Sequence, residues 1–360
     1  MRAGIIAVIV VFSALAGYVG WHLWRISPHG WKPVVVGLFL LWAASFFAAF
    51  TVIERIPVRA ATVLYEVGNT WLIAFLYILL VFLFADIASL CHLLPKALLK
   101  DSAVGLSAVA GIVAVILLLG NIHYHHIYRE EMTVSTTKPL DGPMTIVMAS
   151  DLHLGYHISR TELARWVDMI NAENPDMVLF CGDIIDRSMR PILEGGFEEE
   201  FLRLKGVKVT VMGNHEYFSD TLRVEQFFND SKIFLVKDAV FRYKGVNVIG
   251  RNDRWAGDRQ SLSQLVRYAN DKGGFTILLD HQPQDLWEAE QFGIDFQFSG
   301  HTHRGQVWPV SWITDVIYEK SWGHYRCGDT QYYITSGLGI WGAKVRIGTR
   351  SEYLVLHLTN

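Results

Sequence analysis

The chain has 360 residues, of which 51% are hydrophobic and 19% are charged, whereas an ordinary soluble protein carries about 25% charged residues. Residues 1–122 hold seven basic and four acidic side chains, while residues 123–360 hold 25 basic and 31 acidic ones. This distribution excludes a single soluble globule, a disordered chain and a basic nucleic-acid-binding protein, and three cysteines without a C-x-x-C pair exclude a disulfide framework.

The first third contains four apolar stretches, each close to the roughly 20 residues that a helix needs to cross a bilayer core of about 30 Å. The predicted spans cover residues 4–24, 34–53, 71–94 and 103–122. The first stretch has a signal-peptide alternative with cleavage near Ala16, but its apolar run continues past that point, which favours a retained anchor. We therefore expect a transmembrane domain of four helices over residues 1–122.

The charges beside these spans give a weak orientation signal. With the N-terminus inside, the inner segments carry five basic residues and the outer loops carry four, which predicts a multi-pass protein of the cell (inner) membrane with its C-terminal domain on the cytoplasmic face. Asp86 lies well inside a span, where it is either functional or paired near the headgroups or with a loop lysine. For His123, His125 and His126, after the last span, an interfacial belt of rings is favoured over a metal-binding tract.

Beyond about Glu131 the pattern changes to short apolar strands that alternate with amphipathic helices. We expect a juxtamembrane connector and a first strand over residues 123–143, then one α/β domain over residues 144–360. One helix is well signalled, because Ser159 and Glu162 have capping-box spacing and Leu163 and Trp166 begin an apolar face. The other predicted helices cover residues 197–204, 221–228, 261–269 and 285–291. The predicted strands cover residues 145–149, 177–181, 207–212, 246–249, 275–279 and 296–299, with a hairpin turn at 243–245.

Five of these strands run directly into polar residues at their carboxyl ends, where α/β proteins place their ligands. The metal-ligand candidates are Asp151, His153, Asp183, Asn214, His281, His301 and His303. Carboxylate, imidazole and amide ligands without a thiolate suit Mn²⁺, Fe or Zn²⁺ rather than a structural zinc site. Seven candidates are too many for one ion, and they suit two ions that together clamp a phosphoryl displacement. One such motif arises readily by chance, whereas five in order after five strands do not.

These residues resemble the calcineurin-like metallophosphoesterase family. Its pattern D-x-H, G-D-x-x-D, G-N-H-D/E, a later H and G-H-x-H is present, and the resemblance covers about residues 144–358. Gly305-Gln306 and the tail around residues 336–350 are similar to the membrane-anchored branch typified by YkuE and YaeI. The resemblance implies an αββα fold of two mixed β-sheets flanked by helices.

The resemblance also implies roles for individual residues. One metal ion would be held by Asp151, His153, Asp183 and His303, and the second by Asp183, Asn214, His281 and His301. The cofactors would be two divalent ions, with Mn²⁺ preferred over Fe, Zn²⁺ or Mg²⁺. A metal-activated hydroxide would attack phosphorus, and His215, oriented by Asp186, would protonate the leaving oxygen.

Two arginines are candidates for binding the non-bridging phosphate oxygens, which a guanidinium group fits well. These are Arg187, for which a surface salt bridge is an equal alternative, and Arg304, where many relatives have glycine. Both follow metal-ligand motifs directly.

The segment after the last motif points to the substrate. Residues 306–325 contain Trp308, Trp312, Ile313, Val316, Ile317, Tyr318, Trp322 and Tyr325. Such an apolar lip suits a membrane lipid or lipid-linked phosphate, and the alternative is a loop folded onto its own core. We expect a phosphodiesterase or pyrophosphatase without a nucleic-acid partner, since the soluble part is acidic. A UDP-2,3-diacylglucosamine pyrophosphatase of lipid A synthesis is a specific alternative, and a non-catalytic membrane scaffold or sensor is one of another class.

Overall fold

The computed structural model describes residues 2–270 and 273–360 of the chain. They divide into two compact units, each with its own core. The first unit comprises the residues up to 122 together with the short segment 342–345, and the second comprises residues 123–341 and 346–360.

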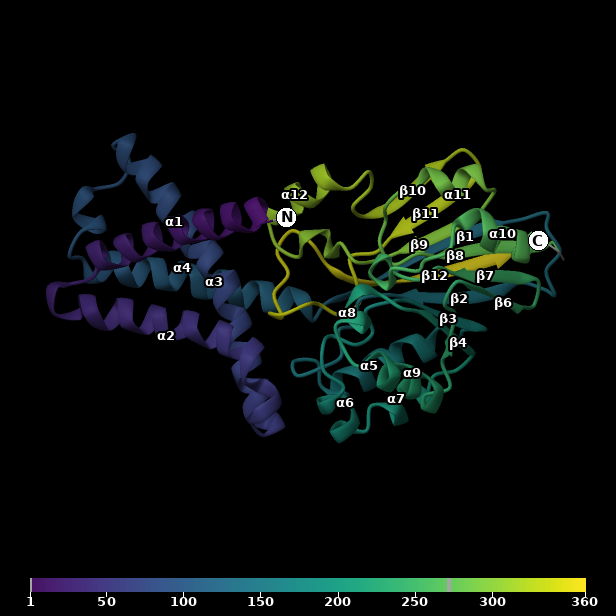
Figure 1. The fold of residues 1–360 in the computed structure, drawn as a ribbon. Helices are drawn as coiled ribbons and strands as arrows, with labels where there is room; N and C mark the ends of the chain where they lie inside the picture. The colour runs from purple at the N-terminus through teal and green to yellow at the C-terminus, as the bar shows by residue number, and fades with distance from the viewer. Residues whose placement is uncertain (1, 271–272) are drawn as a thin grey trace. The chain divides into compact units, whose positions relative to one another are not determined.

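The first unit is built from four helices, shown in purple to blue in Figure 1. They are α1 (Arg2–Ile26), α2 (Lys32–Thr51), α3 (Val58–Leu90) and α4 (Ala103–Tyr124). All four are long and apolar enough to cross a membrane. An aromatic cluster around Phe39, Trp71 and Phe75 packs inside this unit.

The third helix differs from its predicted span over residues 71–94, since it begins at Val58 and ends at Leu90. Pro57 precedes the first helical residue, a position where its missing N–H costs nothing. Arg59 and Glu66 lie before the predicted span and are exposed on the helix surface. These charges interrupt the apolar run of the sequence, but the helix continues through them.

The Asp86 side chain of α3 contacts polar side chains of α1, whereas the sequence left open a pairing with a loop lysine. Its carboxylate accepts a hydrogen bond from the Tyr18 hydroxyl at 2.7 Å, and the Nε2 atom of His22 lies 3.0 Å from the same oxygen. This polar group therefore ties the two helices together within the apolar unit.

The second unit contains two six-stranded mixed sheets. The first has the strand order β1 (Ile127–Ser135), β12 (Ser351–Thr359), β2 (Met144–Ala149), β3 (Met177–Cys181), β4 (Val207–Val211) and β5 (Phe234–Leu235). The second has the order β10 (Gly323–Cys327), β11 (Thr330–Ile334), β9 (Phe296–Ser299), β8 (Phe275–Leu279), β7 (Val246–Gly250) and β6 (Ala239–Tyr243). Strands β2, β3 and β4 are mutually parallel, as are β7, β8 and β9.

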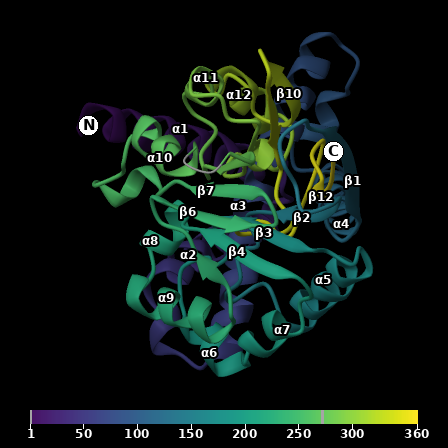
Figure 2. The same ribbon diagram turned by 90° about the vertical axis from the view of Figure 1, so that its right-hand side faces the viewer.

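Helices cover the outer faces of both sheets, which gives the αββα layering expected from the sequence (Figure 2). The first sheet is covered by α5 (Arg160–Ala172), α6 (Arg190–Gly195), α7 (Glu198–Leu202) and α9 (Thr221–Asp230). The second is covered by α10 (Leu262–Asn270) and α11 (Trp287–Gln291). Between the sheets lies an apolar layer that includes Met148, Leu179, Ile277 and Phe298. Short helices α8 (Asn214–Tyr217) and α12 (Val310–Ile317) follow strand ends.

Most predicted elements of this unit are confirmed. The Ser159 hydroxyl accepts a hydrogen bond from the Glu162 backbone N–H, and the predicted apolar face of α5 is buried. The hairpin turn is also present, because Lys244 and Gly245 both have positive φ angles between antiparallel β6 and β7. The edge strand β1 pairs in parallel with its neighbour β12 over nine residues, so the segment after α4 forms part of the first sheet.

Candidate functional site

The candidate ligands stand at the carboxyl ends of five strands drawn from both sheets. Asp151, Asp183 and Asn214 follow β2, β3 and β4 of the first sheet, while His281 and His301 follow β8 and β9 of the second. Since all five ends point toward one edge of the double layer, residues far apart in the sequence converge there.

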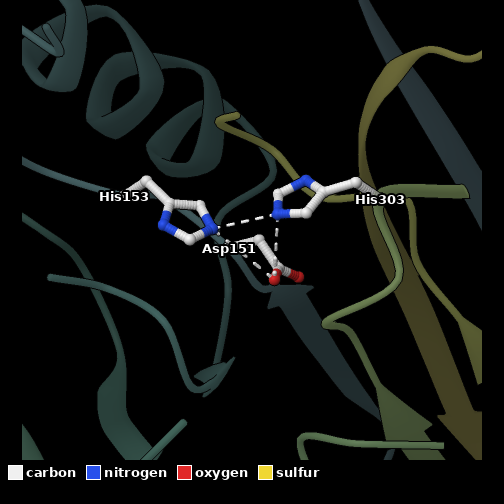
Figure 3. Close-up of side chains that lie close together, drawn as sticks. All are labelled: Asp151, His153 and His303. Carbon is white, nitrogen blue, oxygen red and sulfur yellow. Dashed lines mark hydrogen bonds and ion pairs between the residues drawn. The ribbon is translucent and has the colours of Figure 1, made fainter. Parts of the chain in front are cut away.

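A first group consists of Asp151, His153 and His303. The Nε2 atoms of the two histidines lie 2.9 Å apart, and that of His303 lies 3.5 Å from Oδ1 of Asp151. Figure 3 shows the two imidazole rings facing each other beside the Asp151 carboxylate. One ligand atom from each residue lies within 4.8 Å of the others, which is close enough for one ion to contact all three.

A second group consists of Asp183, His281 and His301, whose ligand atoms also lie within 4.8 Å of one another. The Oδ2 atom of Asp183 is 3.2 Å from Nε2 of His281 and 3.8 Å from Nε2 of His153. One carboxylate oxygen therefore lies within reach of both groups, as a bridging ligand between two ions must.

A buried polar atom in this cluster shows that the residues fit metal ions. Oδ1 of Asn214 is buried and makes no hydrogen bond in the described structure. A buried acceptor without a donor costs free energy, and a divalent cation would satisfy this oxygen. Mixed oxygen and nitrogen donors without sulfur suit a mid-series divalent ion.

The backbone is strained where it presents these side chains. Five of the seven candidate ligands have positive φ angles: Asp151, His153, Asp183, His301 and His303, with values between 46° and 69°. Such a conformation costs a non-glycine residue of order 1–3 kcal/mol and clusters at functional sites. The strain points to a site held in place by the surrounding fold rather than to ordinary loop packing.

Two glycines permit the close approach of the loops. A Cβ atom on Gly213 would lie 2.2 Å from Oδ1 of Asp183, and one on Gly300 would lie 2.2 Å from Oδ2 of Asp151. Any side chain at either position would displace a candidate ligand.

The charges of the cluster favour neutral imidazoles at His301 and His303 but not at His281. Burial would lower the pKa of His281, but the Asp183 and Asp151 carboxylates raise it well above its ordinary value. Burial and the neighbouring His281 lower the pKa of His301 to about 4, and burial with the nearby His153 holds the pKa of His303 well below its ordinary value. Burial alone would raise the pKa of Asp183, but His281 and His215 hold it well below the usual range. Neutral imidazole and ionised carboxylate are the forms that bind metals.

His215 and Asp186 lie beside the first group. Nδ1 of His215 is 3.1 Å from Oδ1 of Asp186, and Nδ1 of His153 is 3.5 Å from the same oxygen. Burial would lower the pKa of His215, but the Asp183 and Asp186 carboxylates outweigh it and raise the pKa to about 9. The side chain is 15% exposed, so a substrate can reach it.

The two candidate arginines differ in their surroundings. Arg187 is exposed. The Arg304 guanidinium lies 4.3 Å from the ring centroid of Trp322, and its buried Nε atom makes no hydrogen bond in the described structure. Arg304 is therefore held beside His303 with a donor available.

Two residues received no role from the sequence. The fully buried Glu216 carboxylate accepts hydrogen bonds from the backbone N–H groups of Gly213, Asp183 and Ile185 at 2.7–2.9 Å. Buried Arg346 donates to the carbonyl oxygens of Ser336 and Gly339 at 2.7 Å, with His303 at 3.3 Å. Glu216 occupies the last position of the G-N-H-D/E motif, which could have revealed it. No local pattern marks Arg346, because its acceptors are carbonyl groups.

Residues 144–305 match the family model described as calcineurin-like phosphoesterase. This segment of the chain is therefore similar to calcineurin-like phosphoesterases. The matched range carries all seven candidate ligands, and the fold around it is the double sheet flanked by helices.

Two bacterial metallophosphoesterases are similar to a larger part of the chain. A metallophosphoesterase of Helicobacter pylori is 31% identical over 229 residues, which cover 61% of this chain and 60% of the relative. The chain thus matches about three fifths of that relative's length. The YkuE metallophosphoesterase of Bacillus subtilis is 27% identical over 259 residues, covering 65% and 86% of the two chains.

One relative also matches the helical region. A protein of Danio rerio named as a transmembrane protein with metallophosphoesterase domain is 24% identical over 348 residues, covering 89% of this chain and 79% of the relative. The combination of apolar helices and a phosphoesterase domain therefore recurs in another protein.

Proposed function

We propose that the chain is a membrane-bound, dinuclear-metal phosphoesterase that hydrolyses a phosphodiester or pyrophosphate bond in a lipid-linked substrate. The observation that carries this proposal is the position of Asp183, one oxygen of which lies within 4 Å of a histidine from each ligand group. A carboxylate shared between two clusters of histidine ligands is typical of a two-metal hydrolytic site.

The residues of the chain divide the work of hydrolysis. Asp151, His153, Asp183 and His303 would hold one ion, and Asp183, Asn214, His281 and His301 the other. Bound divalent ions supply a nucleophile at neutral pH and neutralise charge on the phosphoryl oxygens. His215 stays protonated at neutral pH and gives its proton to the leaving oxygen, while Asp186 fixes its ring. Arg304 binds a non-bridging oxygen through its unpaired N–H.

An apolar surface beside the site supports a lipid-linked substrate. Helix α12 exposes Trp312, Ile313, Val316 and Ile317, with exposed fractions between 55% and 87%. The ring of Tyr318, directly after this helix, lies 6.4 Å from that of His301. Four of the eight residues of the predicted apolar lip are thus exposed, and the other four, Trp308, Tyr318, Trp322 and Tyr325, are half-buried.

The remaining parts of the proposal follow from the helices and the ligand types. We propose a multi-pass protein of the cell (inner) membrane, with the phosphoesterase domain on the cytoplasmic face and Mn²⁺ as the preferred ion. We also propose that the chain belongs to the branch typified by YkuE, to which it is 27% identical over 259 residues.

The decisive experiment uses the full chain in lipid nanodiscs. A nitrophenyl monoester, a bis-nitrophenyl diester and UDP-diacylglucosamine are each offered with Mn²⁺ and with a chelator. We expect Mn²⁺-dependent hydrolysis of the diester or the pyrophosphate, abolished by the chelator. Hydrolysis of no phosphate ester, together with an absence of bound metal in freshly purified protein, would favour a non-catalytic scaffold.

A further inference from the structure

We propose that Phe218 and Trp255 form a subsite for the leaving group, and that this subsite takes a planar aromatic ring. The inference rests on the proposed function, because it uses the role of His215 as the acid that protonates the leaving oxygen. It adds the chemical class of the departing group to that function.

The two rings form a continuous path away from His215. The centroid of the Phe218 ring lies 5.3 Å from that of His215, and Trp255 meets Phe218 edge to face with centroids 5.1 Å apart. Phe218 is 45% exposed and Trp255 is 62% exposed. Two large aromatic side chains thus remain open to solvent directly beside the candidate general acid.

The pair is held in place although it is exposed. Phe218 caps α8 after β4, whereas Trp255 lies in the turn after β7, so the rings come from different sheets. The Tyr217 hydroxyl donates a hydrogen bond to the side chain of Asn252, which joins the two segments. The backbone N–H of Trp255 donates to the buried Asp253 carboxylate at 2.9 Å. Rings fixed in this way lose little freedom when they bind a ligand.

The geometry of in-line displacement places Phe218 and Trp255 on the side of the leaving group. In an in-line displacement the nucleophile and the leaving oxygen lie on opposite sides of phosphorus. The leaving oxygen must lie within hydrogen-bond reach of His215, so the group attached to it extends past His215. Phe218 is in ring contact with His215, whereas the ring of Tyr318, directly after α12, lies 6.4 Å from that of His301.

The chemistry of the pair selects the occupant. An edge-to-face pair of rings with open faces binds another flat ring by stacking, whatever hydrogen-bonding groups that ring carries. An aryl alcohol and a nucleobase share this chemistry. A flexible acyl chain gains no stacking from ring faces, and it fits the α12 surface better.

The test compares two diesters that differ only in the leaving group, phenol or hexafluoroisopropanol, which are alcohols of comparable acidity. We expect W255A and F218A each to lower the ratio of kcat/KM for the aryl ester to that for the fluoroalkyl ester by about tenfold, the effect of one lost stacking contact. W255F should restore most of the ratio. W287A, which removes a similarly exposed tryptophan on α11, should leave it unchanged.

A binding measurement separates the two sources of the ring. Uridine, phenol and ribose are titrated into the full chain in nanodiscs without added metal, and tryptophan fluorescence is followed. Quenching by uridine but not ribose, absent in W255F, supports a nucleobase, and quenching by phenol alone supports a small aryl group.

The outcomes distinguish failure of the proposed aromatic subsite from failure of the proposed phosphoesterase function. If the wild-type chain hydrolyses both esters but neither alanine variant changes the ratio and no ring compound quenches, the subsite is wrong while the phosphoesterase stands. If the chain hydrolyses no ester with any divalent ion, both proposals fall.

Discussion

The Nδ1 atom of His215 lies 2.7 Å from the backbone carbonyl oxygen of Asp186 as well as 3.1 Å from its carboxylate. Both neighbours are acceptors, so Nδ1 must carry a proton. The second ring nitrogen, Nε2, is then the atom that can give a proton to a substrate. Asp186 thus sets both the orientation and the protonation of the ring.

Replacing His215 with asparagine is therefore expected to reduce kcat by about 10²- to 10⁴-fold, the usual contribution of a general acid. The reduction should be smaller for a nitrophenyl ester than for an alkyl ester, because nitrophenolate leaves without help from an acid. Steady-state kinetics on the two esters check this. Equal losses on both would contradict the role of His215 as the acid, and bound metal measured by mass spectrometry should remain at the wild-type level.

Replacing Asp183 with asparagine should remove the shared ligand of both groups. We expect the bound metal to fall below two ions per chain and activity to drop by at least about 10³-fold, since the substitution removes the charge that both ions would share. The amide oxygen can still accept the hydrogen bond from the His215 backbone N–H, so the fold should survive. D258N, on an exposed loop, is the control. Retention of two ions in D183N would rule out a bridging role.

Replacing Gly213 with alanine tests how tightly the loops are packed. Its φ angle of −100° is allowed for any residue, so the only penalty is the contact with Asp183. We expect weaker metal binding in a metal titration and a lower Tm. Gly257 offers the opposite case, because it has a positive φ but open space around it. G257A should lower Tm slightly and leave metal affinity intact. Equal metal affinity in G213A and the wild type would show that the loops can move apart.

The candidate ligands could be proposed from the sequence because they lie in the loops that follow buried strands, and strands of this kind are the strongest local signal in the chain. Strands β3, β8 and β9 have the predicted bounds. The approach of Asp183 to both groups could not be read from spacing, since it depends on how two sheets pack. The same limit explains Arg346 and the Phe218–Trp255 pair, whose members are brought together only by the fold.

The carboxyl-terminal strand was missed for a different reason. Strand β12 is buried along most of its length, so it lacks the alternation of a half-buried strand. Its partner β1 lies within residues 123–143, where the sequence predicts a connector and a first strand. Helix α3 shows the converse limit, because an apolar run marks where a helix can cross a membrane and not where the helix begins.

The exposed face of α12 gives the test of the lipid-linked substrate. Val316 and Ile317 are 87% and 68% exposed beside the site, and a charge there would repel an acyl chain. We expect V316D/I317D to lower the ratio of turnover of a lipid-linked pyrophosphate to that of a soluble nitrophenyl diester by about tenfold or more, measured in nanodiscs. L222D alters a residue of α9 that is 78% exposed, and it should leave the ratio unchanged. If V316D/I317D processes both substrates in the wild-type ratio, the α12 surface does not contact the lipid portion, and the substrate must be sought among soluble phosphate esters.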